Sequence, residues 1–189
     1  MIDSLIAKDI ELLIFLNNLG TEQWDGFWLL VTNKFSAIPL YLFLIWISYK
    51  QFGLKKTIFI VVGALLTVAL SDQTSQFFKY HFMRLRPCWD EDIIPNIRMV
   101  KESCGGKYSY FSAHAANAMA VAGFFSLVLK NKLPKLPILL MIWAVFVAYS
   151  RVYLAVHFPA DIITGLLFGG LYSIVIYVIY KKVNANYLS

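Results

Sequence analysis

The residues of this chain that could do chemistry fall into three short stretches between positions 79 and 161. The first stretch is basic, the second pairs a serine with a histidine, and the third combines an arginine, a histidine and an aspartate. Permanent cations beside imidazoles can hold an anion and act on it, because Arg offers a planar fork of donors and Lys a point charge. The candidates are Lys79, Arg86, Ser112, His114, Arg151, His157 and Asp161.

A phosphate group is the anion that these residues suit best. His114, His157 and Asp161 could in isolation ligate a metal, but three permanent positive charges nearby oppose a metal cation, so we expect no metal and no cofactor. Ser112 has the position of an N-cap, and backbone N–H groups at a helix N-terminus favour an anion. The alternative is a set of basic side chains that snorkel to lipid headgroups. That alternative explains a single Lys or Arg better than it explains the whole set.

The third stretch predicts how the chemistry is divided. Asp161 follows His157 by four residues, and Pro159 between them favours a new helix start. A carboxylate near an imidazole fixes its tautomer and stabilises its charged form, so we expect His157 to attack phosphorus and form a phosphohistidine. His114 has no adjacent carboxylate in sequence and is the expected general acid for the leaving oxygen. Water would then hydrolyse the intermediate, while the cations offset charge on the phosphoryl oxygens.

The composition places these residues in a membrane protein. Hydrophobic residues make up 59% of the 189 positions and charged residues 15%, against a usual charged share of about 25%. The mean hydropathy is +0.64. These values disfavour both a soluble single-core enzyme and a disordered chain. The net charge of +6 first suggests a nucleic-acid binder, but membrane proteins collect Lys and Arg on cytoplasmic loops, so we expect a lipid bilayer and no nucleic acid as partner.

Several apolar stretches approach the roughly 20 residues that cross a bilayer, which predicts an all-α membrane bundle with about five transmembrane helices. Apolar residues at helical spacing in the first twenty positions predict an amphipathic interfacial helix, with an ordinary helix packed on the bundle as the alternative. No linker or repeat indicates a second domain, so residues 1–189 are expected to form one membrane-embedded domain. The predicted spans are Phe27–Tyr49, Ile58–Phe78, Ser112–Leu129, Pro137–Val156 and Pro159–Tyr180. Asn33 and Lys34 interrupt the first of them, so its alternative is a short interfacial segment followed by a span, with Trp24 and Trp28 at the headgroups.

Lysines set the expected orientation. The connections around 50–56, 130–135 and 181–182 hold eight lysines and no acidic residue, and the positive-inside rule puts them in the cytoplasm. The chemistry-bearing stretches then reach the opposite face, which we expect to be the periplasmic or exterior side of a bacterial inner membrane. The long connection on that face contains Cys88 and Cys104. An oxidising compartment favours a disulfide between them, with two unpaired thiols as the alternative.

The three stretches resemble the signature of the type 2 phosphatidic-acid phosphatase superfamily. This superfamily includes lipid phosphate phosphatases and undecaprenyl-diphosphate phosphatases, and its core is similar to that of vanadium haloperoxidases. Residues 79–87 match its first motif, a Lys, six residues and Arg-Pro, and residues 150–161 match the third, Ser-Arg, five residues, His, three residues and Asp. The second motif, Pro-Ser-Gly-His, appears as Phe111-Ser112-Ala113-His114, so nine of eleven signature positions agree over 79–161.

The resemblance assigns the same roles as the residue chemistry. It implies that phosphate is bound by Lys79, Arg86, Arg151 and the Ser112–Ala113 segment, and that no metal is required. It implies further that His157 is the nucleophile, that Asp161 activates it and that His114 is the acid.

Two departures from the family pattern and two further residues need comment. Ala113 keeps a backbone N–H for phosphate but loses the conformational freedom of glycine, and Phe111 gives up the rigidity of proline. Neither change removes a catalytic group, so we expect activity. Asp72 belongs to a polar stripe near the end of the second span, where it either holds Lys79 or makes a satisfied hydrogen bond inside the bundle. Arg84 lies inside the first motif but outside its defined positions, which makes it a secondary candidate for headgroup contact.

The expected substrate is an amphiphile whose phosphate reaches the interface while its acyl or prenyl chain stays in lipid. Undecaprenyl diphosphate is the leading hypothesis, with phosphatidic acid, phosphatidylglycerophosphate and a lipid A phosphate as alternatives. A transporter or anion-binding protein is the non-enzymatic alternative, and the paired histidine and aspartate argue against it. A haloperoxidase-like activity with bound vanadate is a third hypothesis, which the apolar spans disfavour. The oligomeric state is left open.

Overall fold

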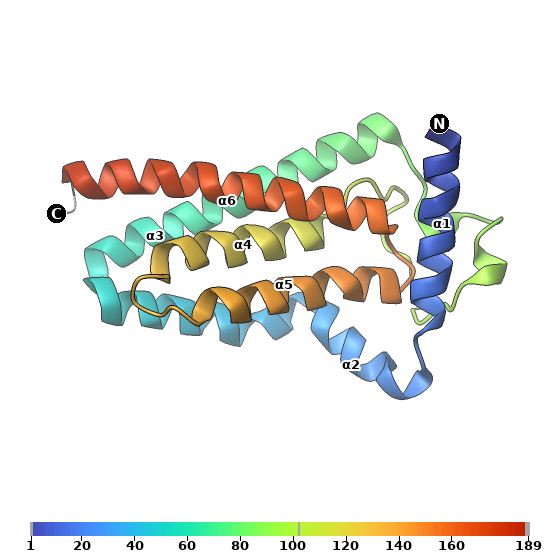
Figure 1. The fold of residues 1–189 in the computed structure, drawn as a ribbon, viewed down its shortest axis with the longest axis horizontal. Coiled ribbons are helices and arrows are strands. Elements are labelled where there is room, and N and C mark those ends of the chain that lie inside the picture. Colours follow the sequence, from blue (N-terminus) through green and yellow to red (C-terminus); the bar gives the residue numbers. More distant parts are fainter. Residues whose placement is uncertain (1, 102, 188–189) are drawn as a thin grey trace.

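The computed structural model describes residues 2–101 and 103–187 as a bundle of α-helices whose axes mostly follow its long dimension (Figure 1). Within these ranges there is no β-strand, and a single isolated bridge pairs Leu85 with Tyr108. The predicted all-α class is confirmed. The helices are α1 (Ile2–Asn18), α2 (Glu22–Thr32), η1 (Lys34–Ala37), α3 (Ile38–Phe82), η2 (Pro87–Trp89), η3 (Ile94–Asn96), α4 (Ala113–Leu129), α5 (Leu136–Tyr153) and α6 (Pro159–Tyr187).

Helix α3 is a helical hairpin and not one straight rod. Its 45 residues would span about 67 Å if straight, roughly twice the hydrocarbon core of a bilayer. The backbone breaks at Gly53, where φ is 77° and ψ is 174°. The two arms on either side of this residue fold back on each other (Figure 1). Counted this way, α3 supplies two apolar segments and α4, α5 and α6 supply three more, in line with the predicted five.

For Phe27–Tyr49 the structure has a short helical segment followed by a span, as in the alternative, and not one uninterrupted span. Helix α2 ends before Asn33, whose backbone is extended with ψ at 124° and whose Oδ1 accepts a hydrogen bond of 2.9 Å from the Phe35 N–H. A short 3-10 turn follows, and the apolar helix begins at Ile38. The polar pair at 33–34 ends the helix because an Asn side chain competes with the helical backbone for hydrogen bonds.

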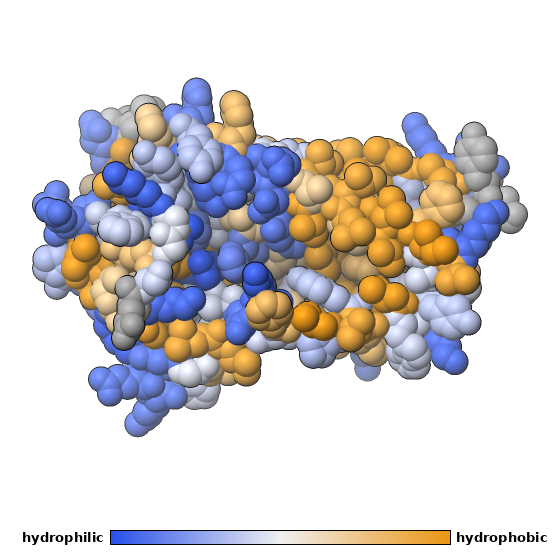
Figure 2. All heavy atoms as spheres, turned by 180° about the vertical axis from the view of Figure 1, so that it is seen from behind, coloured by the Kyte–Doolittle hydropathy of each residue, from blue (hydrophilic) through white to orange (hydrophobic). Residues whose placement is uncertain are grey.

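On the face shown in Figure 2, a wide apolar area lies between two more hydrophilic ends of the bundle. Three helical stretches, numbered 34–82, 136–153 and 159–186, are long and apolar enough to cross a membrane, and α4 is a shorter apolar helix. Leucines on the outside of the bundle, such as Leu42, Leu65, Leu139 and Leu167, are more than half exposed. Exposed leucines in such number suit a lipid environment and would be costly in water. The chain is therefore an integral membrane protein.

Helix α4 is the core of the bundle and lies tightly against α6. A Cβ atom added at Gly169 would collide with the carbonyl oxygen of Ala116, and one at Gly165 would lie 2.6 Å from the carbonyl oxygen of Ser112. Small residues spaced four apart let two helix backbones approach closely, which is how membrane helices associate without a hydrophobic driving force. The approach also joins the helix starts, because the Ser112 N–H donates to the Asp161 carbonyl oxygen at 3.1 Å.

The eight lysines that set the expected orientation occur in segments at one end of the bundle. The turn of α3, the α4–α5 connection and the C-terminal part of α6 all lie there (Figure 1). The ends of the helices that carry the three chemistry-bearing stretches lie at the other end.

Helix α1 crosses that second end, roughly perpendicular to the bundle helices (Figure 1). One face of α1 is packed: Leu13 is fully buried, and the Asn17 side chain donates to the Tyr153 carbonyl oxygen at 2.7 Å. The opposite face exposes Leu5, Phe15 and Leu19. The N-terminal segment is thus a helix packed on the bundle that also presents an apolar face outward.

The turn of α3 gives a first testable prediction. We expect Gly53→Ala to lower the free energy of unfolding by about 1 to 3 kcal/mol, because its backbone conformation is almost exclusive to glycine. Gly26→Ala is the matched control: Gly26 is in a helix with no atom within 4 Å of an added Cβ, so alanine there should stabilise by about 0.5 to 1 kcal/mol. Thermal unfolding in detergent measures both. Equal melting temperatures for the two variants would contradict the hairpin.

Candidate active site

A cavity of about 920 Å³ opens among the helix ends near α1, and all three predicted stretches contribute to its wall. The last turns of α3 and α5, the first turn of α4 and the two connections after α3 and α5 meet there. Residues that are up to 78 positions apart in the chain therefore face one space. The predicted residues in the wall are Lys79, Arg86, Ala113, His114, Arg151 and His157, together with Asp72.

The connection between α5 and α6 brings Arg151 and His157 into the same space. It turns tightly: the Val156 N–H donates to the Arg151 carbonyl oxygen at 3.1 Å, and Ala155 has a positive φ of 52°. Every residue from Arg151 to Phe158 is buried. The turn is thus a packed element of the bundle, which holds both side chains without a flexible loop.

His157 and Asp161 form a buried pair. The Nδ1 atom of His157 lies 3.3 Å from Oδ2 of Asp161, and both side chains are almost completely buried. The same Oδ2 accepts a hydrogen bond of 3.0 Å from the Phe158 N–H, which fixes the carboxylate at the start of α6. Because Nδ1 is engaged with the carboxylate, Nε2 is the nitrogen that is left to attack a bound group.

Burial and nearby cations keep His157 neutral. Burial lowers the pKa of its imidazole well below the usual value of 6.5, and the positive charges of Arg151, Arg86 and Lys79 lower it further. A neutral imidazole keeps the lone pair that a nucleophile needs. The site therefore combines an uncharged imidazole with surrounding cations.

Arg151 has an unsatisfied donor inside the protein. Its guanidinium Nη1 donates to Oγ1 of Thr32 at the end of α2, while its buried Nε has no hydrogen-bond partner among the described residues. An unpaired buried donor of a cation is costly. A phosphate oxygen in the cavity would supply the missing acceptor.

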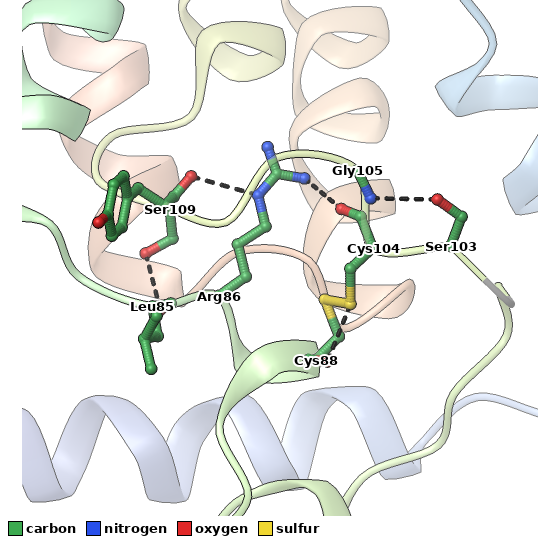
Figure 3. Close-up of a disulfide and its surroundings, with 8 residues drawn as sticks. Leu85, Arg86, Cys88, Ser103, Cys104, Gly105 and Ser109 are labelled. Carbon is green, nitrogen blue, oxygen red and sulfur yellow. Dashed lines mark hydrogen bonds between the residues drawn. A yellow bond between two sulfur atoms is a disulfide. The ribbon is translucent and has the colours of Figure 1, made fainter.

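Arg86 is held by the loop that carries the disulfide (Figure 3). Its Nη1 donates to the Cys104 carbonyl oxygen at 2.6 Å and its Nε to the Tyr108 carbonyl oxygen at 3.2 Å. Cys104 is bonded to Cys88, two residues after Arg86. Gly105 next to it has a φ of 71°, and an added Cβ would lie 3.2 Å from Arg86 Nη1. The disulfide and the glycine together shape the carbonyl cradle for this guanidinium.

The structure shows the surroundings of three further predicted residues, Ser112, Arg84 and Asp72. Ser112 is fully buried, and its Oγ accepts from the Ala115 N–H at 3.4 Å, so its hydroxyl caps α4. Arg84 binds protein carboxylates, as described further below. Asp72 lies in the cavity wall on the same helix as Lys79, but their separation of seven positions corresponds to about 10 Å along the axis.

Sequence reasoning missed three residues at or beside the site. Thr32 contacts Arg151, Asn117 lines the cavity one turn after His114, and Asp9 of α1 reaches the start of α6. Only Asp9 carries a signal in the sequence, because it is an acidic residue inside an apolar helical pattern.

The Arg86 cradle generates a second prediction. We expect the Cys88→Ser/Cys104→Ser double variant to bind inorganic phosphate about tenfold more weakly, since a hydrogen bond to a charged group contributes about that factor. Isothermal titration calorimetry in detergent measures the affinity, and a reductant should shift the wild type in the same direction. Trp89→Ala, an exposed position in the same loop, is the control and should keep full affinity. Unchanged affinity after reduction would contradict this role for the disulfide.

Comparisons with known proteins agree with this arrangement. Over 98% of the chain and 83% of the relative, the sequence is 32% identical to a lipid A 4'-phosphatase of Bacteroides thetaiotaomicron. It is 34% identical to a lipid A 4'-phosphatase of Porphyromonas gingivalis, over 97% of the chain and 78% of the relative. An undecaprenyl-diphosphatase of Sulfolobus acidocaldarius is 33% identical over 87% of the chain and 67% of the relative.

Solved structures share the fold. The transmembrane PAP2 type phosphatidylglycerolphosphate phosphatase of Bacillus subtilis superimposes with a TM-score of 0.75 at 19% identity, over 95% of this chain and 88% of that one. Aquifex aeolicus LpxE superimposes with a TM-score of 0.68 at 24% identity, over 88% of this chain and 92% of that one. The model of the PAP2 superfamily matches residues 58–185, which include every predicted catalytic and phosphate-binding residue. The chain belongs to the PAP2 superfamily and is a membrane lipid phosphatase.

Proposed function

We propose that the chain hydrolyses a phosphate ester of a lipid A-type glycolipid, without a metal ion and through a phosphohistidine at His157. The observation that carries the proposal is the cavity in which a neutral, carboxylate-paired imidazole meets three cationic side chains and a second histidine. Binding alone does not need the buried pair of His157 with Asp161, so the geometry supports turnover over anion transport.

The residues divide two steps of phosphoryl transfer. In the first step, Nε2 of His157 forms a bond to phosphorus while the bond from phosphorus to the lipid oxygen breaks, and His114 donates a proton to that leaving oxygen. In the second step, His114 takes a proton from water, water oxygen bonds to phosphorus and the nitrogen–phosphorus bond breaks. Lys79, Arg86 and Arg151 offset the charge on the phosphoryl oxygens in both steps, and the Asp161 carboxylate stabilises the positive charge that His157 gains.

The cavity has room for more than a phosphate. Polar groups continue beyond the cations, with Gln76, Asn117 and Ser103 in the wall, and a volume of about 920 Å³ is near the upper end of the range in which proteins hold drug-sized ligands. A sugar headgroup has the hydrogen-bonding capacity to use such a wall.

An apolar groove adjoins the cavity on the lipid side. Its volume is about 330 Å³, and it lies between α3 and α4 with Ile45, Leu65 and Phe125 in its wall. Tyr41 and Asn117 line both spaces. A substrate with a polar phosphorylated head and a hydrocarbon chain can therefore occupy the two together, which supports an amphiphile over a soluble phosphate ester.

Undecaprenyl diphosphate is the second candidate, and the Sulfolobus acidocaldarius relative favours it. Both lipid A 4'-phosphatases cover nearly the whole chain, whereas this relative covers 87%. The sequence alone favours undecaprenyl diphosphate as the substrate. Because the two relatives that match nearly the whole chain are lipid A 4'-phosphatases, we propose a lipid A phosphate instead.

We propose further that the site faces the periplasm or exterior of a bacterial inner membrane. The lysine-bearing connections lie at the end of the bundle opposite the site, and the positive-inside rule assigns that end to the cytoplasm. The disulfide lies at the site end, where an oxidising compartment would maintain it.

A lipid panel tests the substrate and the mechanism together. We expect phosphate release from lipid A to exceed release from undecaprenyl diphosphate, phosphatidic acid and phosphatidylglycerophosphate. His157→Ala should abolish turnover, and His114→Ala should lower it by about 10² to 10⁴. Substrate labelled with ³²P should leave acid-labile label on the wild type and none on His157→Ala. His81→Ala, at an exposed site on α3, is the control. Full activity of the His157 variant would refute the mechanism.

The lowered pKa of His157 predicts the pH dependence. Protonated imidazole cannot attack, and the pKa of His157 lies below the usual 6.5. We therefore expect the acidic limb of kcat/KM, which reports His157, to lie below pH 6.5. Arg86→Gln removes one of the charges that lower this pKa, so the acidic limb should move to higher pH. His81→Gln should leave the limb in place. An acidic limb above pH 6.5 in the wild type would contradict a neutral His157.

A further inference from the structure

We propose that Asp9 and Arg84 are positioning residues for the His157–Asp161 pair, so that docking of α1 across the bundle end completes the active site. The role in catalysis rests on the proposed function. The observation is a chain of ionic contacts that starts on α1, passes through the loop after α3 and ends on the carboxylate beside the nucleophile.

Arg84 bridges two carboxylates that come from opposite ends of the chain. Its Nη2 atom donates to Oδ2 of Asp9 at 2.7 Å, and its Nη1 atom donates to Oδ1 of Asp161 at 3.3 Å. Asp161 therefore uses its two oxygens differently: Oδ2 faces His157, and Oδ1 faces Arg84. A planar fork with several donors can make both contacts, whereas a lysine has a single charged nitrogen.

Asp9 binds both Arg84 and the start of α6. Its Oδ1 atom accepts a hydrogen bond of 2.8 Å from the N–H of Ala160, the residue directly before Asp161. An acidic side chain is favoured at a helix N-terminus, where N–H groups lack partners within the helix. One side chain of α1 thus fixes the backbone that carries Asp161 and the guanidinium that binds it.

Phe158 completes the arrangement. The guanidinium of Arg84 lies over its ring, with Cζ at 3.6 Å from the ring centroid. Phe158 follows His157 directly, and its own N–H donates to Asp161. Arg84 is thereby held from one side by a ring and at its edge by two carboxylates, which restricts it to one orientation.

Arg84 and Asp9 lie outside the wall of the substrate cavity. Neither residue is among the described residues of the cavity wall, so both act through Asp161 and not on the substrate. The Asp161 side chain is fully buried, and a buried carboxylate without a cation is strongly disfavoured. Arg84 therefore keeps Asp161 ionised while His157 gains positive charge in the first chemical step.

The chain contains a matched control pair. Asp25 of α2 binds Arg98 of the same long connection through two contacts of 3.1 Å, at an exposure similar to that of Arg84 and Asp9. This pair also joins an N-terminal helix to the loop, and Asp25 accepts from the Tyr153 hydroxyl and not from the catalytic pair. Loss of the control ion pair should lower stability and leave the chemistry intact.

The experiment compares Arg84→Gln, Arg84→Lys, Asp9→Asn and the double variant Asp9→Asn/Arg84→Gln with Asp25→Asn in full-length protein. Asn keeps an oxygen for the Ala160 N–H and removes the charge together with the second acceptor, which faces Arg84. We expect Arg84→Gln to lower kcat on the order of tenfold with KM within about twofold, and Arg84→Lys to recover part of the loss. Asp9→Asn should lower kcat by a smaller factor. The double variant should match Arg84→Gln, because Asp9 acts through Arg84.

Binding of orthovanadate to the purified protein gives a readout that needs no lipid turnover. Vanadate can bond to the imidazole nitrogen, so its affinity reports on the orientation of His157. We expect Arg84→Gln to bind it about tenfold more weakly and Asp25→Asn to bind it as the wild type does. A wild type that binds vanadate but hydrolyses no panel lipid would count against the proposed substrate while leaving this readout intact.

Two results would overturn the proposal. One is full kcat and full vanadate affinity in Arg84→Gln. The other is an equal loss in Asp25→Asn, which would show that any ion pair between an N-terminal helix and the loop has the same effect. If Arg84→Gln does not fold, Arg84→Lys and Asp9→Asn carry the test, with the same two results decisive.

Discussion

The active site depends on one ionised carboxylate buried where α6 begins. Asp161 has no access to solvent, and its oxygens are surrounded by the His157 ring, the Phe158 N–H and the Arg84 guanidinium. A buried charge persists only where donors and a cation compensate it. The tight turn after α5, the close contact of α4 with α6 and the position of α1 across the bundle end all place such groups around this carboxylate.

A bound phosphate would explain why the remaining cations are tolerated. Lys79, Arg86 and Arg151 lie near the end of an otherwise apolar bundle, within a cavity that also contains polar groups. An uncompensated set of like charges is unfavourable, and a phosphate that binds among them relieves both the repulsion and the unpaired Nε donor of Arg151. The same destabilisation of the empty site would contribute to binding, and the apolar groove beside it has room for part of a hydrocarbon chain.

Most of the fold could be predicted from the sequence because a membrane restricts the secondary structure of the segments that cross it. Each apolar segment long enough to cross must be helical to satisfy its own backbone, so the last three spans agree with the observed helices except at their ends. At Phe27–Tyr49 the polar pair Asn33–Lys34 indicated an interruption, and the Asn33 side chain makes the break there. The hairpin of α3 depends on one glycine conformation, which hydropathy does not report.

By itself, the sequence identified the family and predicted the chemistry, because motif spacing is local and residue types set charge, nucleophilicity and helix starts. Lys79, Arg86, His114, Arg151, His157 and Asp161 were all identifiable in this way. Only the tertiary structure showed that Arg84 binds Asp161, and that Asp9, 152 positions before Asp161, binds Arg84. These contacts join segments far apart in the chain, and their partners are chosen by packing geometry, which the local pattern of a single sequence does not contain.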